Sequence, residues 1–175
     1  EALAWGSNLD WGFNKHPPMV AFVLEFFYQI FGSQDWAYYL LSQIFVIISF
    51  YFIFKLSSEI LKNKFLGLIS VILIETIYFY NFTTPEFKVN VCELPFWSIT
   101  AFYTWRIYNG KNIKFWDYFL LGLFAALGFL SKYLFVYLLV SVVFLFIYLI
   151  IKKERKFEFK YLIIIEVFIV ALIPH

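Results

Sequence analysis

The chain has little charge and almost no cysteine. Only 15% of its 175 residues are Asp, Glu, Lys or Arg, whereas a soluble globular domain has about 25%. Hydrophobic residues make up 63%, and a soluble protein of this size could not hide that much apolar surface from water. The single cysteine, Cys92, excludes an internal disulfide framework and a multi-cysteine metal site. These deficits exclude a water-soluble domain and indicate a protein embedded in lipid.

Apolar runs fill most of the sequence. A helix that crosses the hydrocarbon core needs about 20 mostly apolar residues, and helices satisfy their own backbone hydrogen bonds in lipid. The sequence therefore predicts an all-α, polytopic membrane protein. Its six predicted spans are residues 36–54, 65–80, 91–105, 116–130, 133–151 and 161–173. Residues 1–35 are predicted to form an extracytoplasmic loop that contains an interfacial helix at 17–31, and residues 36–175 the transmembrane region.

The positive charges predict the orientation of these spans. Eleven of the 14 Lys and Arg residues fall in alternate connections, which the positive-inside rule places in the cytoplasm. They are Lys55, Lys62, Lys64, Arg106, Lys111, Lys114, Lys152, Lys153, Arg155, Lys156 and Lys160. The opening loop, the turns near residues 81–90 and 131–132, and His175 are then extracytoplasmic.

Polar residues that could take part in catalysis or binding gather on this predicted outer side. Several loops that meet at one face can build a site on the rigid scaffold of the spans. Taken alone, Asp10, Asp35 or Lys88 is equally well a solvated surface charge, and a lone histidine near an interface is more often structural than catalytic. The candidates are Glu1, Asp10, Lys15, His16, Glu86, Lys88, Lys132 and His175.

Three carboxylates fall inside predicted spans and support an alternative. Glu75, Glu93 and Glu166 would each cost about 2.5–3.5 kcal/mol to insert, so such groups are functional candidates by default. Glu75 and Glu93 lie near the outer ends of their spans, and Glu166 lies near the middle of the last one. A secondary transporter with intramembrane carboxylates is therefore an alternative hypothesis. A non-catalytic membrane subunit is a third.

Four short motifs, in order, carry a resemblance to a known family. The opening residues 1–18 read EALAWGSNLDWGFNKHPP, and they are followed by Thr84-Pro85-Glu86, by GFLSKY at residues 128–133 and by Pro174-His175. The first motif resembles the first periplasmic loop of glycosyltransferase family 39. That group includes the dolichyl-phosphate-mannose protein mannosyltransferases and the bacterial aminoarabinose transferases. The other motifs resemble later outer turns of the same family.

The resemblance implies a fold of the GT-C type and an inverting glycosyltransferase. It implies a polyprenyl-phosphate-linked sugar as donor, a lipid, glycan or protein as acceptor, and no nucleic-acid partner. The expected location is the inner, or plasma, membrane, with the active loops periplasmic. By this resemblance the catalytic candidates are Glu1 and Glu86, and the substrate-binding candidates are Asp10, Lys15, His16, Lys132 and Tyr133.

The family's loop carries an Asp-Glu pair, and its aspartate is the presumed base. Glu1 matches the glutamate, so the aspartate is expected just before the first residue, and the chain is expected to be a segment of a longer protein, cut at both ends. No metal site is assigned. A divalent cation stays open, because Glu1, Glu86 and His16 supply oxygen and nitrogen ligands without defining a geometry.

Overall fold

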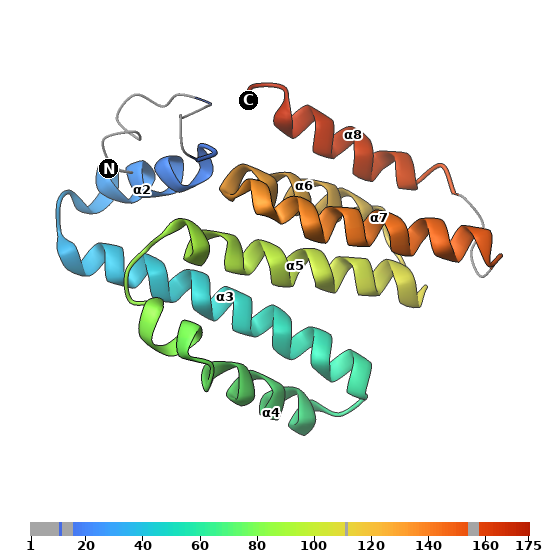
Figure 1. Cartoon of the computed structure of the whole chain (residues 1–175), viewed down its shortest axis with the longest axis horizontal. Coiled ribbons are helices and arrows are strands. Elements are labelled where there is room, and N and C mark those ends of the chain that lie inside the picture. Colours follow the sequence, from blue (N-terminus) through green and yellow to red (C-terminus); the bar gives the residue numbers. More distant parts are fainter. Residues whose placement is uncertain (1–10, 12–15, 111, 154–157) are drawn as a thin grey trace.

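The computed structural model describes residue 11 and residues 16–110, 112–153 and 158–175, and these form helices joined by short connections (Figure 1). The all-α prediction is confirmed for this part of the chain. The helices are α2 (Met19–Phe31), α3 (Asp35–Leu61), α4 (Lys64–Glu75), α5 (Val89–Asn109), α6 (Phe115–Ser131), α7 (Val136–Ile151) and α8 (Tyr161–Leu172). A π-helical turn, η1 (Phe79–Thr83), precedes α5, and a 3₁₀ turn, η2 (Tyr133–Phe135), leads directly into α7.

Two helical segments are long and apolar enough to cross a membrane: Asp35–Leu61 and Tyr133–Ile151. Helices α2, α6 and α8 are apolar but shorter. Large apolar side chains such as Ile47 and Phe144 are about two-thirds exposed, while small polar ones such as Ser42 and Ser131 are fully buried. This is the pattern of helices that face lipid and meet through small residues. The described residues therefore contain two candidate spans, and the six-span topology stays a prediction.

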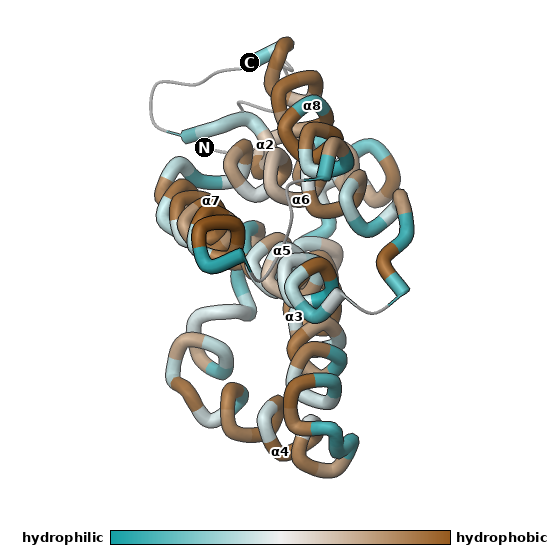
Figure 2. The backbone as a smooth tube through the Cα atoms, turned by 90° about the vertical axis from the view of Figure 1, so that its right-hand side faces the viewer, coloured by the Kyte–Doolittle hydropathy of each residue, from teal (hydrophilic) through white to brown (hydrophobic). Residues whose placement is uncertain are grey.

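The helices run in alternating directions (Figure 1). Helix α3 packs against α4 and α5, and α6 packs against α5 and α8, so α4 and α8 lie at opposite edges. Helix α7 contacts α5 and η2, and α2 lies across α3, α5 and α6. Hydrophobic residues run along α7 and α8 (Figure 2). We call the end with Asp35, Lys132 and His175 the outer end, following the predicted orientation, and the opposite end the inner end.

The helix boundaries differ most from the predicted spans at the ends of α3 and α4. The first span was predicted to end at residue 54, but α3 continues to Leu61, because lysine and serine residues at the inner end are compatible with a helix that extends beyond an apolar core. The second was predicted as one helix to residue 80, but α4 ends at Glu75. There the Thr76 hydroxyl donates to the carbonyl oxygen of Leu73 at 2.7 Å, and the chain turns into η1.

The inner connections are fixed by side-chain caps. The Asn63 side chain accepts hydrogen bonds from the first amides of α4, at 2.8 Å from Phe65 N and 3.4 Å from Leu66 N. Asp117 accepts one from Lys114 N at 2.7 Å at the start of α6, and its other oxygen lies 3.0 Å from Arg106 Nε on α5. The pair Arg106–Asp117 therefore joins the inner ends of α5 and α6.

Gly128 sets the outer end of α6. An ideal Cβ built on this residue would lie 2.3–2.6 Å from atoms of the Phe135 ring, closer than real contacts allow. Phe135 is fully buried in the central apolar cluster with Leu41, Cys92 and Phe96. The glycine therefore lets the ring of η2 fold back onto α6, which brings the turn at residues 131–133 over α5.

We predict that Gly128→Ala destabilises the protein by about 1–3 kcal/mol, the usual cost of overpacking a core. Its thermal midpoint in detergent should fall clearly below that of the wild type. Adding Phe135→Leu, which removes the ring that the new methyl group meets, should recover part of the loss. An unchanged midpoint for Gly128→Ala would contradict this account of the turn.

Candidate functional site

The outer ends of α5 and α6 bring a cation, a carboxylate and an amide together. Lys132 Nζ donates to Asn90 Oδ1 at 2.5 Å and lies 3.4 Å from Glu93 Oε1. The side chains of Lys132 and Glu93 are only 24% and 14% exposed, so bulk water screens this ion pair incompletely. Trp97 Nε1 donates to the other Glu93 oxygen at 3.3 Å. Asn90, Glu93 and Trp97 share one face of α5, as their three- and four-residue spacings allow.

The turn that carries Lys132 is held from below by α6. Ser131 is fully buried, and its hydroxyl donates to the carbonyl oxygen of Leu127 at 2.8 Å and lies 3.6 Å from Cys92 Sγ on α5. Lys132 itself leaves the helix in an extended conformation, while its amide still bonds to the Gly128 carbonyl at 3.2 Å. The extended backbone at this position therefore directs the Lys132 side chain toward α5.

This cluster opens into a cavity of about 480 Å³. The cavity combines the charged and amide groups of the cluster with a mostly aromatic wall, the usual composition of a small-molecule site. Its lining residues are Phe79, Tyr80, Asn90, Glu93, Leu94, Trp97, Lys132, Leu134 and Tyr137. An ammonium and an amide in such a site can bind phosphate or hydroxyl oxygens through charge-assisted or neutral hydrogen bonds.

A second contact chain joins Tyr133 to the opening segment. The Tyr133 hydroxyl lies 3.1 Å from His175 Nε2, and His175 Nδ1 hydrogen-bonds to the backbone carbonyl of Trp11. The Trp11 ring meets Phe22 of α2 edge to face, with 5.0 Å between ring centroids. Three segments far apart in sequence thus meet beside Lys132.

Glu86 lies in the loop before α5, where it forms an ion pair with Lys88 at 2.7 Å, with both side chains more than half exposed. The loop is anchored by buried Thr84, whose carbonyl oxygen accepts a hydrogen bond from Ser42 of α3 and whose hydroxyl donates to Tyr80 O at 2.8 Å. The sequence placed Glu86 among the catalytic candidates, and in the structure its ion-pair partner is Lys88.

The other predicted site residues divide into two groups. His16 is half-buried and precedes the fully buried pair Pro17-Pro18 at the start of α2. Glu1, Asp10 and Lys15 lie outside the described residues. The roles predicted for all of these residues stay predictions.

Sequence reasoning missed Asn90, Trp97 and Tyr137 as site residues. It noted Glu93, but as an intramembrane carboxylate and not as the partner of Lys132. The signal available was the spacing of Asn90, Glu93 and Trp97 on one helical face at a predicted outer end.

The three carboxylates of the transporter alternative do not share a site. Glu93 is paired with Lys132, Glu75 ends α4, and Glu166 lies on α8 at the opposite edge of the molecule (Figure 1). Transporter sites are built where such groups converge near the midplane. The arrangement does not favour that alternative.

Within the described residues, no three His, Cys, Asp or Glu side chains lie together as a metal site would require. Glu93, the carboxylate of the cavity, already faces an ammonium group. The sequence named Glu1, Glu86 and His16 as possible metal ligands. Because Glu1 lies outside the described residues, the binding of a divalent cation stays an open question.

Apolar helices with exposed hydrophobic side chains, and a charged, aromatic-walled cavity at one end, are typical of a membrane protein with a polar cavity. Residues 15–175 match the family model described as dolichyl-phosphate-mannose-protein mannosyltransferase, and the chain belongs to this family. It is therefore a glycosyltransferase of the kind that takes its sugar from a polyprenyl phosphate. Neither a comparison with curated proteins nor one with solved structures gives a significant match.

The Lys132–Glu93 pair should contribute to stability. We predict that Lys132→Met, which leaves the largely buried Glu93 carboxylate without its partner, lowers the free energy of unfolding by about 1–2 kcal/mol. Adding Glu93→Gln should recover part of this loss, because the unpaired charge is then gone. Thermal unfolding in detergent measures both.

The control is Lys88→Met, which breaks the exposed pair with Glu86 and should change stability by less than about 0.5 kcal/mol. If Lys88→Met and Lys132→Met destabilised the protein equally, the difference in burial between the two ion pairs would not determine how much each contributes to stability.

Proposed function

We propose that this protein is an inverting glycosyltransferase that moves a sugar from a polyprenyl-phosphate donor to a lipid, glycan or protein acceptor on the extracytoplasmic face of the plasma membrane. The observation that supports this most is the Lys132–Asn90–Glu93 cluster at the mouth of an aromatic-walled cavity. Its chemistry suits a phosphate next to a sugar.

Lys132 is the proposed phosphate ligand. An ammonium group has three N–H donors, and Asn90 and Glu93 engage two of them. The third is free to meet a phosphate oxygen at the cavity. Glu93 and Asn90 then act as positioning residues that hold the ammonium group in place.

In the transfer, the acceptor oxygen bonds to the anomeric carbon from the face opposite the phosphate, and the bond from that carbon to the phosphate oxygen breaks. The electron pair of the broken bond leaves with the polyprenyl phosphate, whose added charge Lys132 offsets. The acceptor's proton passes to a carboxylate acting as general base. From the family resemblance, that base is the aspartate expected before Glu1, supported by Glu1 or Glu86.

The remaining candidates have supporting roles in this proposal. His16 and Lys15 are further phosphate ligands, and Asp10 and Tyr133 contact the sugar or the acceptor. Tyr133 is tied through His175 to the opening segment at Trp11. That contact links the opening segment, which carries Asp10, Lys15 and His16, to the turn of Lys132.

The proposal is tested by following radiolabelled sugar from a polyprenyl-phosphate donor pool to lipid and protein acceptors, in membranes that contain the full-length protein. We predict that Lys132→Met lowers kcat roughly 100-fold, as the loss of one group that stabilises developing charge does. The double variant Lys132→Met/Glu93→Gln should recover stability but not transfer, which separates the role in phosphate binding from a structural one.

The control is Lys160→Gln, an exposed cation at the inner end that pairs with Glu158 at 3.9 Å. It should transfer sugar at the wild-type rate. Wild-type transfer by the double variant would overturn the assignment of Lys132.

A separate prediction concerns the residues taken from the family motifs. His16→Ala and Glu86→Ala should each sharply reduce transfer while expression holds, because the opening loop and the loop before α5 both contribute to the proposed site. A non-catalytic membrane subunit predicts the reverse, since neither variant would then alter transfer. Near-normal transfer by both variants would remove these two residues from the site.

A further inference from the structure

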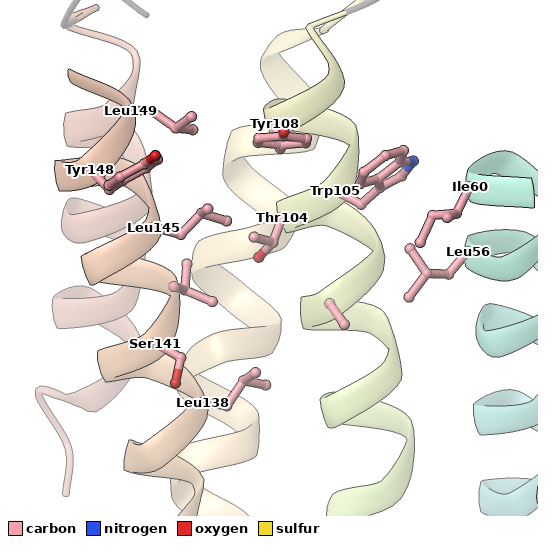
Figure 3. Close-up of a pocket in the computed structure, with 12 residues that line it drawn as sticks. Leu56, Ile60, Thr104, Trp105, Tyr108, Leu138, Ser141, Leu145, Tyr148 and Leu149 are labelled. Carbon is pink, nitrogen blue, oxygen red and sulfur yellow. The ribbon is translucent and has the colours of Figure 1, made fainter. Parts of the chain in front are cut away.

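The inner half of the molecule contains an apolar cavity of about 600 Å³ that the proposed transfer does not use. Helix α5 lies between α3 and α7, and side chains of all three helices line the cavity (Figure 3). They include Leu56 of α3, Tyr108 of α5, and Leu138, Leu145 and Leu149 of α7. The cavity is thus an elongated groove along helices that face lipid.

The length of the groove fits one leaflet of a bilayer. From Leu138 to Leu149 the helix advances 11 residues, which is about 16 Å at 1.5 Å per residue. The hydrocarbon core is about 30 Å thick, so the groove spans about half of it. An acyl chain of a single leaflet has this length, whereas a long polyprenyl chain would overrun it.

A second, polar cavity of about 650 Å³ continues the groove at the inner end. The two cavities share Ile60 and Trp105, and the polar one adds Glu59, Lys62 and Arg106. Arg106 is held by Asp117 through its Nε, whereas Glu59 and Lys62 are exposed at the end of α3. The carboxylate of Glu59 and the ammonium group of Lys62 therefore lie at the inner end of the apolar groove, which we call its mouth.

Two polar atoms lie unpartnered at the level where the groove meets this mouth. Thr104 lines the groove and is only 7% exposed, yet its hydroxyl has no hydrogen-bond partner. The Trp105 Nε1 donor is also buried without a partner, and it lies at the junction of the two cavities. Both atoms are covered by protein atoms and do not open into the groove, so the apolar lining and the charged mouth define what the groove can bind.

We infer that this groove binds one glycerophospholipid of the inner leaflet whose headgroup carries both a phosphate and an ammonium. The acyl chain lies along α7, Lys62 binds the phosphate, and Glu59 binds the ammonium. The assignment to the inner leaflet rests on the proposed orientation; the binding itself does not depend on the transfer reaction.

The test uses the full-length protein, purified in mild detergent and freed of lipid, and native mass spectrometry with phosphatidylethanolamine, phosphatidylglycerol and polyprenyl phosphate. One molecule of phosphatidylethanolamine should bind more tightly than either of the others. Glu59→Gln should abolish the preference over phosphatidylglycerol, and Lys62→Gln should weaken both phospholipids roughly fivefold, the upper range for an exposed charge contact. Both residues are exposed, so these variants are expected to fold.

A third variant, Ala101→Phe, places a ring on the α5 side of the groove and should block binding of all three lipids. The matched control is Lys64→Gln, an exposed cation at the inner end outside both cavities, and it should bind as the wild type does. Equal binding of the two phospholipids by the wild type, tighter binding of polyprenyl phosphate, or equal weakening by Lys64→Gln would overturn the inference. The inference would also be overturned if the wild type bound none of the three lipids.

Discussion

The contact between α5 and α6 is the interaction on which the outer site depends. Cys92, Ser131 and Phe135 are fully buried where these helices meet, and Gly128 leaves the space that the Phe135 ring occupies. In lipid, helices gain little from burying apolar surface, so small residues and close packing must hold them together. Because the ring folds back here, the chain reverses within a few residues and carries Lys132 over α5.

The surrounding lipid also limits where charged side chains can lie. The described ion pairs lie at the helix ends. Lys132–Glu93 and Lys88–Glu86 are at the outer end, and Arg106–Asp117 and Lys160–Glu158 are at the inner end. Charges that leave water must be paired, and those at the ends keep partial access to it. The outer cavity and the inner polar mouth follow from this one constraint, since each is a place where polar groups on neighbouring helices can reach one another.

The sequence predicted much of the fold and less of the site. Long apolar runs predicted the helices. Alternating positive charge predicted their orientation and the family motifs predicted Lys132 and Tyr133 as site residues, and both of these stay predictions. The partners of Lys132 were not predicted, because they depend on the rotation of α5 about its axis. Sequence periodicity reports that rotation poorly in a helix with apolar residues on every side. Glu86 shows the same limit: its place in a motif says nothing about which cation it meets, and it meets its neighbour Lys88.

Helix α5 explains why hydropathy alone understates the membrane region. It has 21 residues, yet it is not among the helices apolar enough to pass as a span. It packs between α3 and α6 and carries more buried residues than any other described helix, so protein rather than lipid surrounds most of it. Polar residues are therefore tolerated along its length, including Ser98, whose hydroxyl donates to the carbonyl oxygen of Pro95 at 2.9 Å. The same helix bears Glu93 at its outer end and Thr104, Trp105 and Arg106 at its inner end. A single central helix thus contributes to both polar sites, and its low hydropathy is a consequence of that position.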